Sequence, residues 1–261
     1  MSERGPRSGP FLIALGIGAL LVFTGLVALG LWQVERRAWK LDLIAKVDQR
    51  VHAPAAPVPG PGQWPQVQAA SDEYRRVTAS GTFLHDRETL VQATTALGGG
   101  YWVLTPLQQA DGSIVFVNRG FVSPERRDRA TRGDRAPAGE ATVTGLLRIT
   151  EPGGGFLRHN NPAANLWYSR DVQAIAAARG LNRVAPFFID EAAPAGPGTA
   201  AAKEPAWPIA GLTVIQFPNS HLTYAITWFG LALMVLAAAG YVARDELRVR
   251  RSRMREDARH D

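Results

Sequence analysis

Residues 11–31 read FLIALGIGALLVFTGLVALGL, and residues 221–242 read HLTYAITWFGLALMVLAAAGYV. Neither stretch contains Asp, Glu, Lys or Arg. Each is as long as the roughly 20 apolar residues that an α-helix needs to cross a bilayer. The segment between them has the mixed polar composition of a water-exposed domain. The sequence therefore predicts two transmembrane helices that flank one large domain.

The first span has a second interpretation, a cleaved signal peptide. Its apolar run is longer than the usual h-region of 7–15 residues, so we favour a retained anchor. Small residues let transmembrane helices approach closely. In the first span they predict a contact stripe made of Ala14, Gly18, Gly25 and Ala28.

Positive charge near the spans predicts the orientation, because short cytoplasmic segments carry an excess of Lys and Arg. The tail after the second span is rich in arginine. Arg36, Arg37 and Lys40 follow the first span and favour the opposite orientation, but long domains translocate largely regardless of such charges. The predicted order is a cytoplasmic N-tail at 1–10, transmembrane helix 1 at 11–32, a periplasmic domain at 33–220, transmembrane helix 2 at 221–243 and an Arg-rich cytoplasmic C-tail at 244–261. In a mitochondrion the tails would lie on the matrix side and the domain in the space equivalent to the periplasm.

Charge and cysteine content exclude several function classes. The formal net charge is +6 at pH 7, but the basic residues are spread over both tails and the middle domain. Because no concentrated basic stripe is present, we predict membrane lipid as a partner of the Arg-rich tail and no nucleic acid. The sequence has no cysteine, which excludes a thiolate metal site and a thiol nucleophile.

Alternating apolar residues and turn signals between the spans predict an antiparallel sheet with one amphipathic helix. A hairpin turn is expected at 110–113, and the helix should run from Asp171 as N-cap to Gly180 as C-terminal stop. We expect a second turn at Gly120, tied by the Arg119 guanidinium to a carboxylate or to carbonyls. The fold class is thus a membrane protein with two transmembrane α-helices flanking a β-rich α+β extracytoplasmic domain. Strands are predicted at 74–83, 89–94, 102–108, 114–118, 141–149, 186–190 and 212–217, the last running straight into the second span, and an exposed loop is predicted at 192–208.

The sequence contains no motif with the residue spacing of a known catalytic site. The glycine triplets at 98–100 and 153–155 lack the Lys-Ser/Thr pair that a phosphate-binding loop requires. The chain has neither a GxSxG elbow nor an HExxH helix. Asp190 and Glu191 are adjacent, so on a strand they would face opposite sides. We predict that the protein is not an enzyme and has no catalytic residues.

His221 differs from the other histidines because it opens the second span. On a helix, Tyr224, Ala225, Trp228 and Ala232 would lie on its face. Small alanines beside aromatic rings would leave a slot for a flat ligand, and neutral imidazole is a standard axial ligand of haem iron. The alternative is that these polar rings simply lie at the membrane–water interface.

Four blocks of sequence occur in order along the chain between residues 11 and 243. They are LWQVERRAWK at 31–40, GYWVLTPL at 100–107 followed by VNRGF at 117–121, NLWYSRD at 165–171, and PNSHLTYAITWFG at 218–230. Together, with a span at each end, they resemble the surfeit locus protein one family. Two departures are mild: Phe121 stands where many members have Trp, and Ser220 where a second Asn is common.

That family consists of assembly factors for haem-copper cytochrome c oxidase. The resemblance implies an assembly factor, a chaperone of the respiratory chain, that binds haem a and assists its insertion into the oxidase. Haem a would be the cofactor, with His221 as the ligand of the haem iron and Tyr224 and Trp228 as further binding residues. The implied partners are the oxidase catalytic subunit and, as a second candidate, haem a synthase. The implied location is the inner membrane of a bacterium, with the large domain in the periplasm.

Two other functions compete with this interpretation. The first is a cofactor-free membrane scaffold that stabilises an oxidase assembly intermediate, with His221 as an interface residue. The second is a membrane-anchored hydrolase, which the missing motifs disfavour. Visible absorbance of the purified protein would separate the haem-binding factor from the scaffold.

Overall fold

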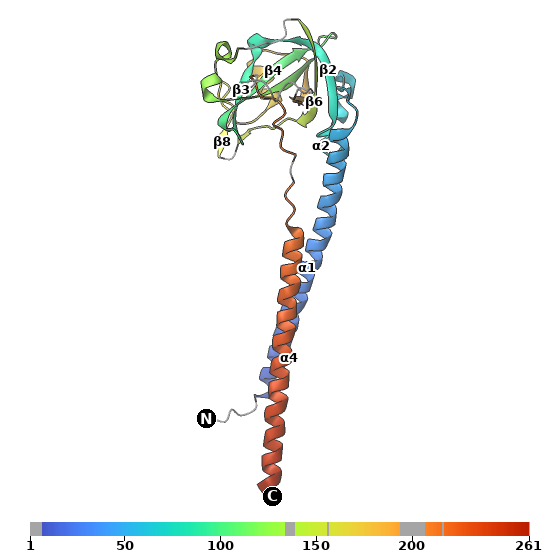
Figure 1. The fold of residues 1–261 in the computed structure, drawn as a ribbon, viewed down its shortest axis with the longest axis vertical. Helices are drawn as coiled ribbons and strands as arrows, with labels where there is room; N and C mark the ends of the chain where they lie inside the picture. Colours follow the sequence, from blue (N-terminus) through green and yellow to red (C-terminus); the bar gives the residue numbers. More distant parts are fainter. Residues whose placement is uncertain (1–6, 134–138, 156, 194–206, 216, 261) are drawn as a thin grey trace, which may run out of the picture. The chain divides into compact units, whose positions relative to one another are not determined.

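The computed structural model describes residues 7–133, 139–155, 157–193, 207–215 and 217–260. The chain divides into two compact units. One consists of residues 1–45 with 216–261, and the other of residues 46–215. The first unit contains two long helices and the second is built around a β-sheet (Figure 1).

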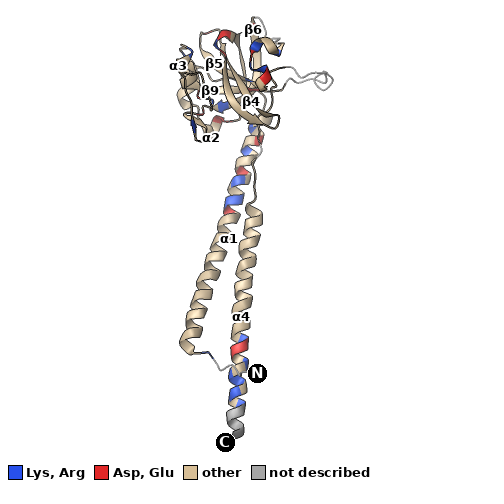
Figure 2. Cartoon of the chain, turned by 90° about the vertical axis from the view of Figure 1, so that its left-hand side faces the viewer, with Lys and Arg blue, Asp and Glu red and all other residues tan. Residues whose placement is uncertain are grey.

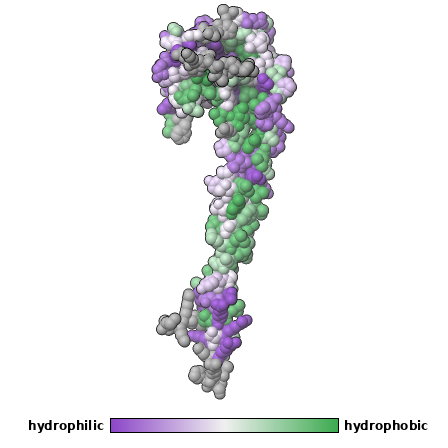
Figure 3. All heavy atoms as spheres, viewed as in Figure 1, coloured by the Kyte–Doolittle hydropathy of each residue, from purple (hydrophilic) through white to green (hydrophobic). Residues whose placement is uncertain are grey.

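The two helices of the first unit are α1, Gly9–His52, and α4, His221–His260. Both are long and apolar enough to cross a membrane. Figure 2 shows that charged residues gather beyond the apolar stretches of the two helices, and Figure 3 shows the apolar surface of these stretches. The predicted pair of apolar helices flanking a sheet-rich domain is confirmed, and His221 is the first residue of α4. These two candidate membrane helices support a membrane protein.

The two helices contact each other through a different face of α1 from the one predicted. Gly18 and Gly25 have no neighbouring atom within 4 Å of where a Cβ would lie. Gly30 is buried instead, and a Cβ there would lie 2.6 Å from the ring of Phe229. The predicted contact stripe is wrong because the Phe229 ring of α4 packs on Gly30, which lies on a different face of α1. The side chains of Ala14 and Ala28 are exposed.

The second unit is a sheet that closes on itself. Five strands follow one another in the order β2-β6-β9-β5-β4, and the barrel is closed by the pairs Thr82↔Gln108 and Phe83↔Leu107. Neighbouring strands are antiparallel except β5–β9 and β1–β2. The sheet contains β1 Ala56–Pro57, β2 Arg76–Phe83, β3 Thr89–Thr95, β4 Gly98–Gln108, β5 Ile114–Val122, β6 Glu140–Ile149 and β9 Val184–Glu191.

Short elements complete this unit. The hairpin turn predicted at 110–113 joins β4 to β5, with Gly112 at φ +77°. Strands β7 and β8 form a separate small hairpin. These elements are β7 Gly154–Gly155, β8 Arg158–His159, α2 Ala69–Asp72, α3 Val172–Ala178, and the 3₁₀ turns η1 Pro61–Gln66, η2 His85–Arg87, η3 Pro124–Arg126 and η4 Arg129–Arg132.

Two apolar cores lie on opposite faces of the same strands. Alternate residues of the barrel strands, among them Val115 and Val117, fill the barrel interior. Phe116 between them faces outward and packs with Trp167 under α3. This alternation follows from the period of two along a strand. The predicted caps of α3 are confirmed, since the Asp171 carboxylate accepts the Ala174 N–H at 3.1 Å. Gly180 adopts a φ of +65° just after the helix.

Two sequence predictions about this unit are wrong. Strand β5 continues to Val122, so no turn forms at Gly120. Gly120 has a φ of +127°, and a Cβ there would lie 2.2 Å from the Ile209 carbonyl oxygen. A glycine is required because the backbone near Ile209 crosses the strand at that point, where Phe121 and Ile209 form an isolated bridge.

The strand predicted at 212–217 does not form in residues 212–215 and 217. Val214 is 75% exposed there. The apolar, β-branched run has the propensity of a strand, but its described residues pair neither with β5, which β4 and β9 already flank, nor with the edge strands β1 and β3. Most of the loop predicted at 192–208 lies outside the described residues.

Candidate functional site

The His221 imidazole lies at the start of α4 and is half-buried. Its Nδ1 lies 2.7 Å from Oε1 of Gln33, a buried residue of α1. An amide oxygen only accepts hydrogen bonds, so Nδ1 carries the proton and donates it. Nε2 makes no hydrogen bond with any residue that the structure describes. The ring is thus held at one nitrogen and offers the lone pair of the other.

Tyr224 and Trp228 lie one and two turns further along α4. The Tyr224 side chain is exposed. The Trp228 ring is half-buried, and its Nε1 is fully buried without a hydrogen-bond partner among the described residues. A buried N–H without an acceptor is costly, so this donor marks a place where an acceptor from outside the described chain would be favourable.

The slot predicted beside the imidazole is not open. Ala225 and Ala232 are each only 3% exposed. They share the face of α4 that carries His221, and this face packs against α1 around Gly30 and Gln33. The alanines therefore serve close helix packing, and the surface left for a ligand is the side of the imidazole that carries Nε2.

These residues fit a haem at one coordination position. Neutral imidazole with a free Nε2 is a standard axial ligand of haem iron, and a hydrogen bond at Nδ1 is the usual way to orient such a ring. The exposed ring of Tyr224 supplies a flat apolar neighbour. Among the described residues, no cluster of three or more His, Cys, Asp or Glu could hold a metal ion. The protein's contribution at this site would therefore be one ligand, His221.

Sequence reasoning missed a buried ionic cluster in the barrel unit. Asp190 of β9 is 3% exposed and accepts hydrogen bonds from four side chains. Its Oδ1 accepts from Asn118 at 2.7 Å and from Arg170 at 3.2 Å. Its Oδ2 accepts from Arg148 at 2.9 Å and from Thr213 at 3.1 Å. One carboxylate thus ties together β5, β6, β9 and two loops.

Glu151 completes this cluster beside Asp190. It receives two hydrogen bonds from the Arg170 guanidinium, one of them at 3.0 Å from Nε to Oε2, and a third from the Arg170 backbone N–H at 3.4 Å. Burial raises the pKa of the Glu151 carboxyl, but the hydrogen bonds and positive charge of Arg170, with the charge of Arg148, outweigh burial and hold that pKa below its usual value. The positive charges of Arg148 and Arg170 therefore balance the negative charges of Asp190 and Glu151, which indicates that the cluster stabilises the fold. A signal was available, because Asp190 interrupts the apolar run before it.

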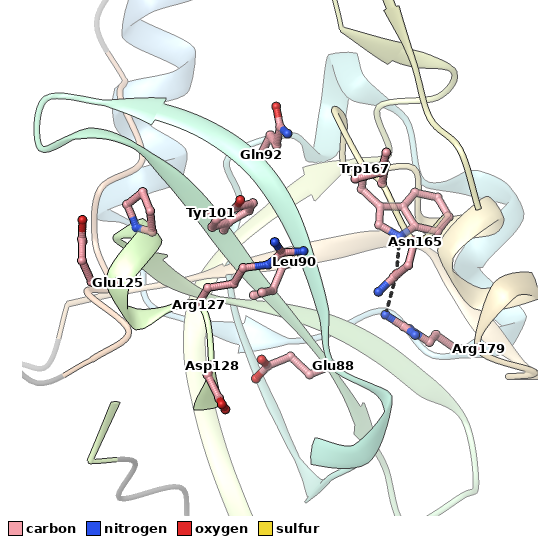
Figure 4. Close-up of a pocket in the computed structure, with 12 residues that line it drawn as sticks. Glu88, Leu90, Gln92, Tyr101, Glu125, Arg127, Asp128, Asn165, Trp167 and Arg179 are labelled. Atoms are coloured by element: carbon pink, nitrogen blue, oxygen red, sulfur yellow. Dashed lines mark hydrogen bonds between the residues drawn. The ribbon is translucent and has the colours of Figure 1, made fainter. Parts of the chain in front are cut away.

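A cavity of about 660 Å³ opens beside the edge strand β3 (Figure 4). On one side, the Arg127 guanidinium carbon lies 5.3 Å from the centroid of the Tyr101 ring. On the other, Asn165 Oδ1 accepts from Trp167 Nε1 and from Arg179 Nη2, both at 2.9 Å. The described residues that line it include Glu88, Glu125 and Asp128 but no histidine, serine or threonine, so they provide no Ser–His or Thr–His pair. The predicted site residues lie in α4, outside this cavity.

Comparison with known proteins covers most of the chain. The sequence matches the SURF1 family over residues 20–233. It is 34% identical to surfeit locus protein 1 of Rattus norvegicus over 82% of this chain and 69% of the rat protein. It is also 34% identical to surfeit locus protein 1 of Homo sapiens over 85% of this chain and 74% of the human protein. A SURF1-like protein of Monosiga brevicollis is 33% identical over 80% of each chain. The family match includes part of each long helix and the whole barrel that lies between them in the sequence, and the chain belongs to the SURF1 family.

Proposed function

We propose that this protein is an assembly factor for cytochrome c oxidase that binds haem a through His221 and assists its insertion into the catalytic subunit. Membership of the SURF1 family supports the assembly role. The observation that carries the haem role is the geometry of His221, an imidazole held at Nδ1 with its Nε2 unengaged. The protein performs no reaction of its own in this proposal, and haem a synthase would be the donor that it meets.

The proposal places both apolar helices in the inner membrane of a bacterium and the barrel unit in the periplasm. The arginines of the C-terminal part of α4 support this orientation through the positive-inside rule (Figure 2). His221, as the first residue of α4, would then lie at the periplasmic edge of the membrane. A periplasmic phosphatase fused after Asp261 should be inactive, and an active fusion would contradict the orientation.

Each site residue has a distinct role in the proposal. His221 would hold the haem through Nε2, and the exposed Tyr224 ring would supply an apolar contact surface. Trp228 would be a further binding residue, and a haem oxygen that accepted from its Nε1–H would satisfy a donor that lacks a partner among the described residues. When bound, haem a would supply the redox-active iron that the oxidase catalytic subunit receives.

The test is the haem content of single-site variants. Each variant is co-expressed with a haem a pathway, purified in detergent, and measured for Soret absorbance per protein. His221→Ala should lose most of the haem, because the two apolar stretches at 11–31 and 221–242 contain no second histidine and no cysteine. His52→Ala is the matched control, since the His52 side chain is exposed on α1 and pairs with Asp48 of the same helix. If His221→Ala keeps the wild-type haem content and spectrum, the ligand assignment is wrong.

A second candidate function is the cofactor-free scaffold. One observation favours it: the face of α4 that carries His221 packs on α1, and the Gln33 bond alone would explain a polar residue there. In this case the purified wild-type protein would show no haem absorbance, while His221→Ala would still reduce oxidase assembly by loosening the helix pair. Wild-type absorbance that depends on His221 would exclude the scaffold.

A further inference from the structure

We propose that Gln33 is a positioning residue that fixes His221 in the tautomer protonated at Nδ1 and so presents Nε2 to the haem iron. The inference rests on the proposed function, which names His221 as the ligand but assigns nothing to Gln33. It adds a second residue, from the other helix, to the binding site.

The geometry of the contact defines the tautomer. Gln33 Oε1 and His221 Nδ1 are 2.7 Å apart, a short hydrogen bond. Oε1 has no proton to donate, so the bond forms only when the imidazole carries its proton on Nδ1. In neutral imidazole the other nitrogen is then an unprotonated acceptor, which is the form that binds a metal.

Packing of the helix pair holds Gln33 in place. Gln33 is only 9% exposed. Gly30 lies one turn earlier on the same face of α1, and the Phe229 ring occupies the space that a side chain at Gly30 would need. The close approach at this glycine brings α1 near enough for Gln33 to reach the start of α4. Ala225, one turn after His221, is buried in the same interface.

The Gln33–His221 hydrogen bond should strengthen haem binding, because it is made by the imidazole nitrogen that does not bind the metal. A hydrogen bond at the non-ligating nitrogen orients the ring and raises its basicity, and loss of such a partner typically weakens metal binding about 10- to 100-fold. A stronger acceptor in the same place makes the imidazole a better electron donor. It therefore stabilises the oxidised iron and moves the reduction potential to more negative values.

Two variants of Gln33 separate these effects. Gln33→Leu removes the acceptor while keeping a helix-forming side chain of similar size. Gln33→Glu replaces the amide by a carboxylate acceptor. Gln49→Leu is the matched control, since Gln49 is exposed on the same helix. All are purified as full chains in detergent, without haem, and then titrated with haem a.

The first measurement needs no haem. Nitrogen NMR spectra of histidine-labelled protein, with His221→Ala to assign the signal, should show a protonated Nδ1 and an unprotonated Nε2 for His221 in the wild type. Gln33→Leu should shift this pattern toward protonation at Nε2, and Gln49→Leu should leave it unchanged. A wild-type His221 protonated at Nε2 overturns the inference whatever the haem titration gives.

The second measurement is the haem titration. Gln33→Leu should bind haem a about 10- to 100-fold more weakly. Gln33→Glu should keep haem and show a more negative reduction potential than the wild type. Haem binding that depends on His221 but is unchanged in affinity and potential by both Gln33 variants overturns this inference alone. A wild-type protein that binds no haem a overturns the proposed function, and this inference with it.

Discussion

Replacing Asp190 by alanine should destabilise the barrel unit more than any surface charge substitution. The Asp190 carboxylate is buried and accepts hydrogen bonds from Arg148, Arg170, Asn118 and Thr213. Both arginine side chains are only 13% exposed. The substitution removes one partner of two buried ion pairs and leaves their charges with fewer compensating groups.

The magnitude follows from the remaining contacts. Removing one partner from a buried ion pair costs about 3–5 kcal/mol. The cost should lie at the lower end, because Arg170 keeps both guanidinium bonds to Glu151 and Arg148 keeps Glu73 at 3.4 Å. One kcal/mol shifts the melting temperature of a domain of this size by roughly 2–4 °C, so Asp190→Ala should lower it by roughly 6–12 °C.

The assay is thermal unfolding of the full chain in detergent, followed by circular dichroism. Asp86→Ala is the matched control. Its carboxylate pairs with Arg87 at 3.0 Å, but both side chains are at least half exposed. Exposed pairs contribute about 0–1 kcal/mol, so this variant should melt within a few degrees of the wild type. If Asp190→Ala and Asp86→Ala have the same melting temperature, the hydrogen bonds and ion pairs of Asp190 do not stabilise the barrel.

Two further predictions concern the same unit. Burial raises the pKa of the Glu191 carboxyl, and Arg119 offsets this only in part. The folded state therefore favours protonated Glu191, a contribution that is present below the unfolded pKa and lost as the pH rises through the folded pKa. The glutamine of Glu191→Gln is neutral at every pH. This variant should therefore melt at a higher temperature than the wild type at neutral pH, but at the same temperature when the pH is below the usual carboxyl pKa. An equal gain in melting temperature at the two pH values would contradict this prediction. Gly120→Ala should cost more than about 1–3 kcal/mol in the same assay, because strain at φ +127° adds to a clash with the Ile209 carbonyl. Gly99→Ala, with nothing within 4 Å, is its control, and equal melting of the two variants would refute the argument.

Local signals predicted much of the fold. Uninterrupted apolar runs predicted both long helices, because helix formation and apolar character are properties of neighbouring residues. The turn at 110–113 and the caps of α3 were predicted for the same reason, since Gly112, Asp171 and Gly180 act within a few residues. Barrel closure was not predicted. It rests on pairs such as Phe83↔Leu107, which join residues far apart in the sequence.

The wrong predictions share a physical cause. Residues 212–215 have strand propensity, but a strand needs a free partner, and this depends on the whole sheet. The stripe of small residues in α1 was chosen by size alone, whereas Gly30 meets α4 because Phe229 lies opposite it. At the candidate site, the sequence predicted His221 as the first residue of α4 but not Gln33 as its partner, because nothing in either helix alone indicates which faces meet.

The Gln33–His221 bond also bears on how two apolar helices find one arrangement. Apolar side chains pack against each other in many rotations and registers, because dispersion is not directional. A single hydrogen bond between polar residues in such an interface favours the register in which both are paired, since any other leaves a polar group buried without a partner. Gly30 restricts the rotation of α1, and Gln33 fixes its position along α4. Both the haem-binding factor and the scaffold need this fixed arrangement. Nε2 of His221 bonds to no described residue, and it is the atom at which the two proposed functions differ, because only the haem-binding factor assigns it a ligand.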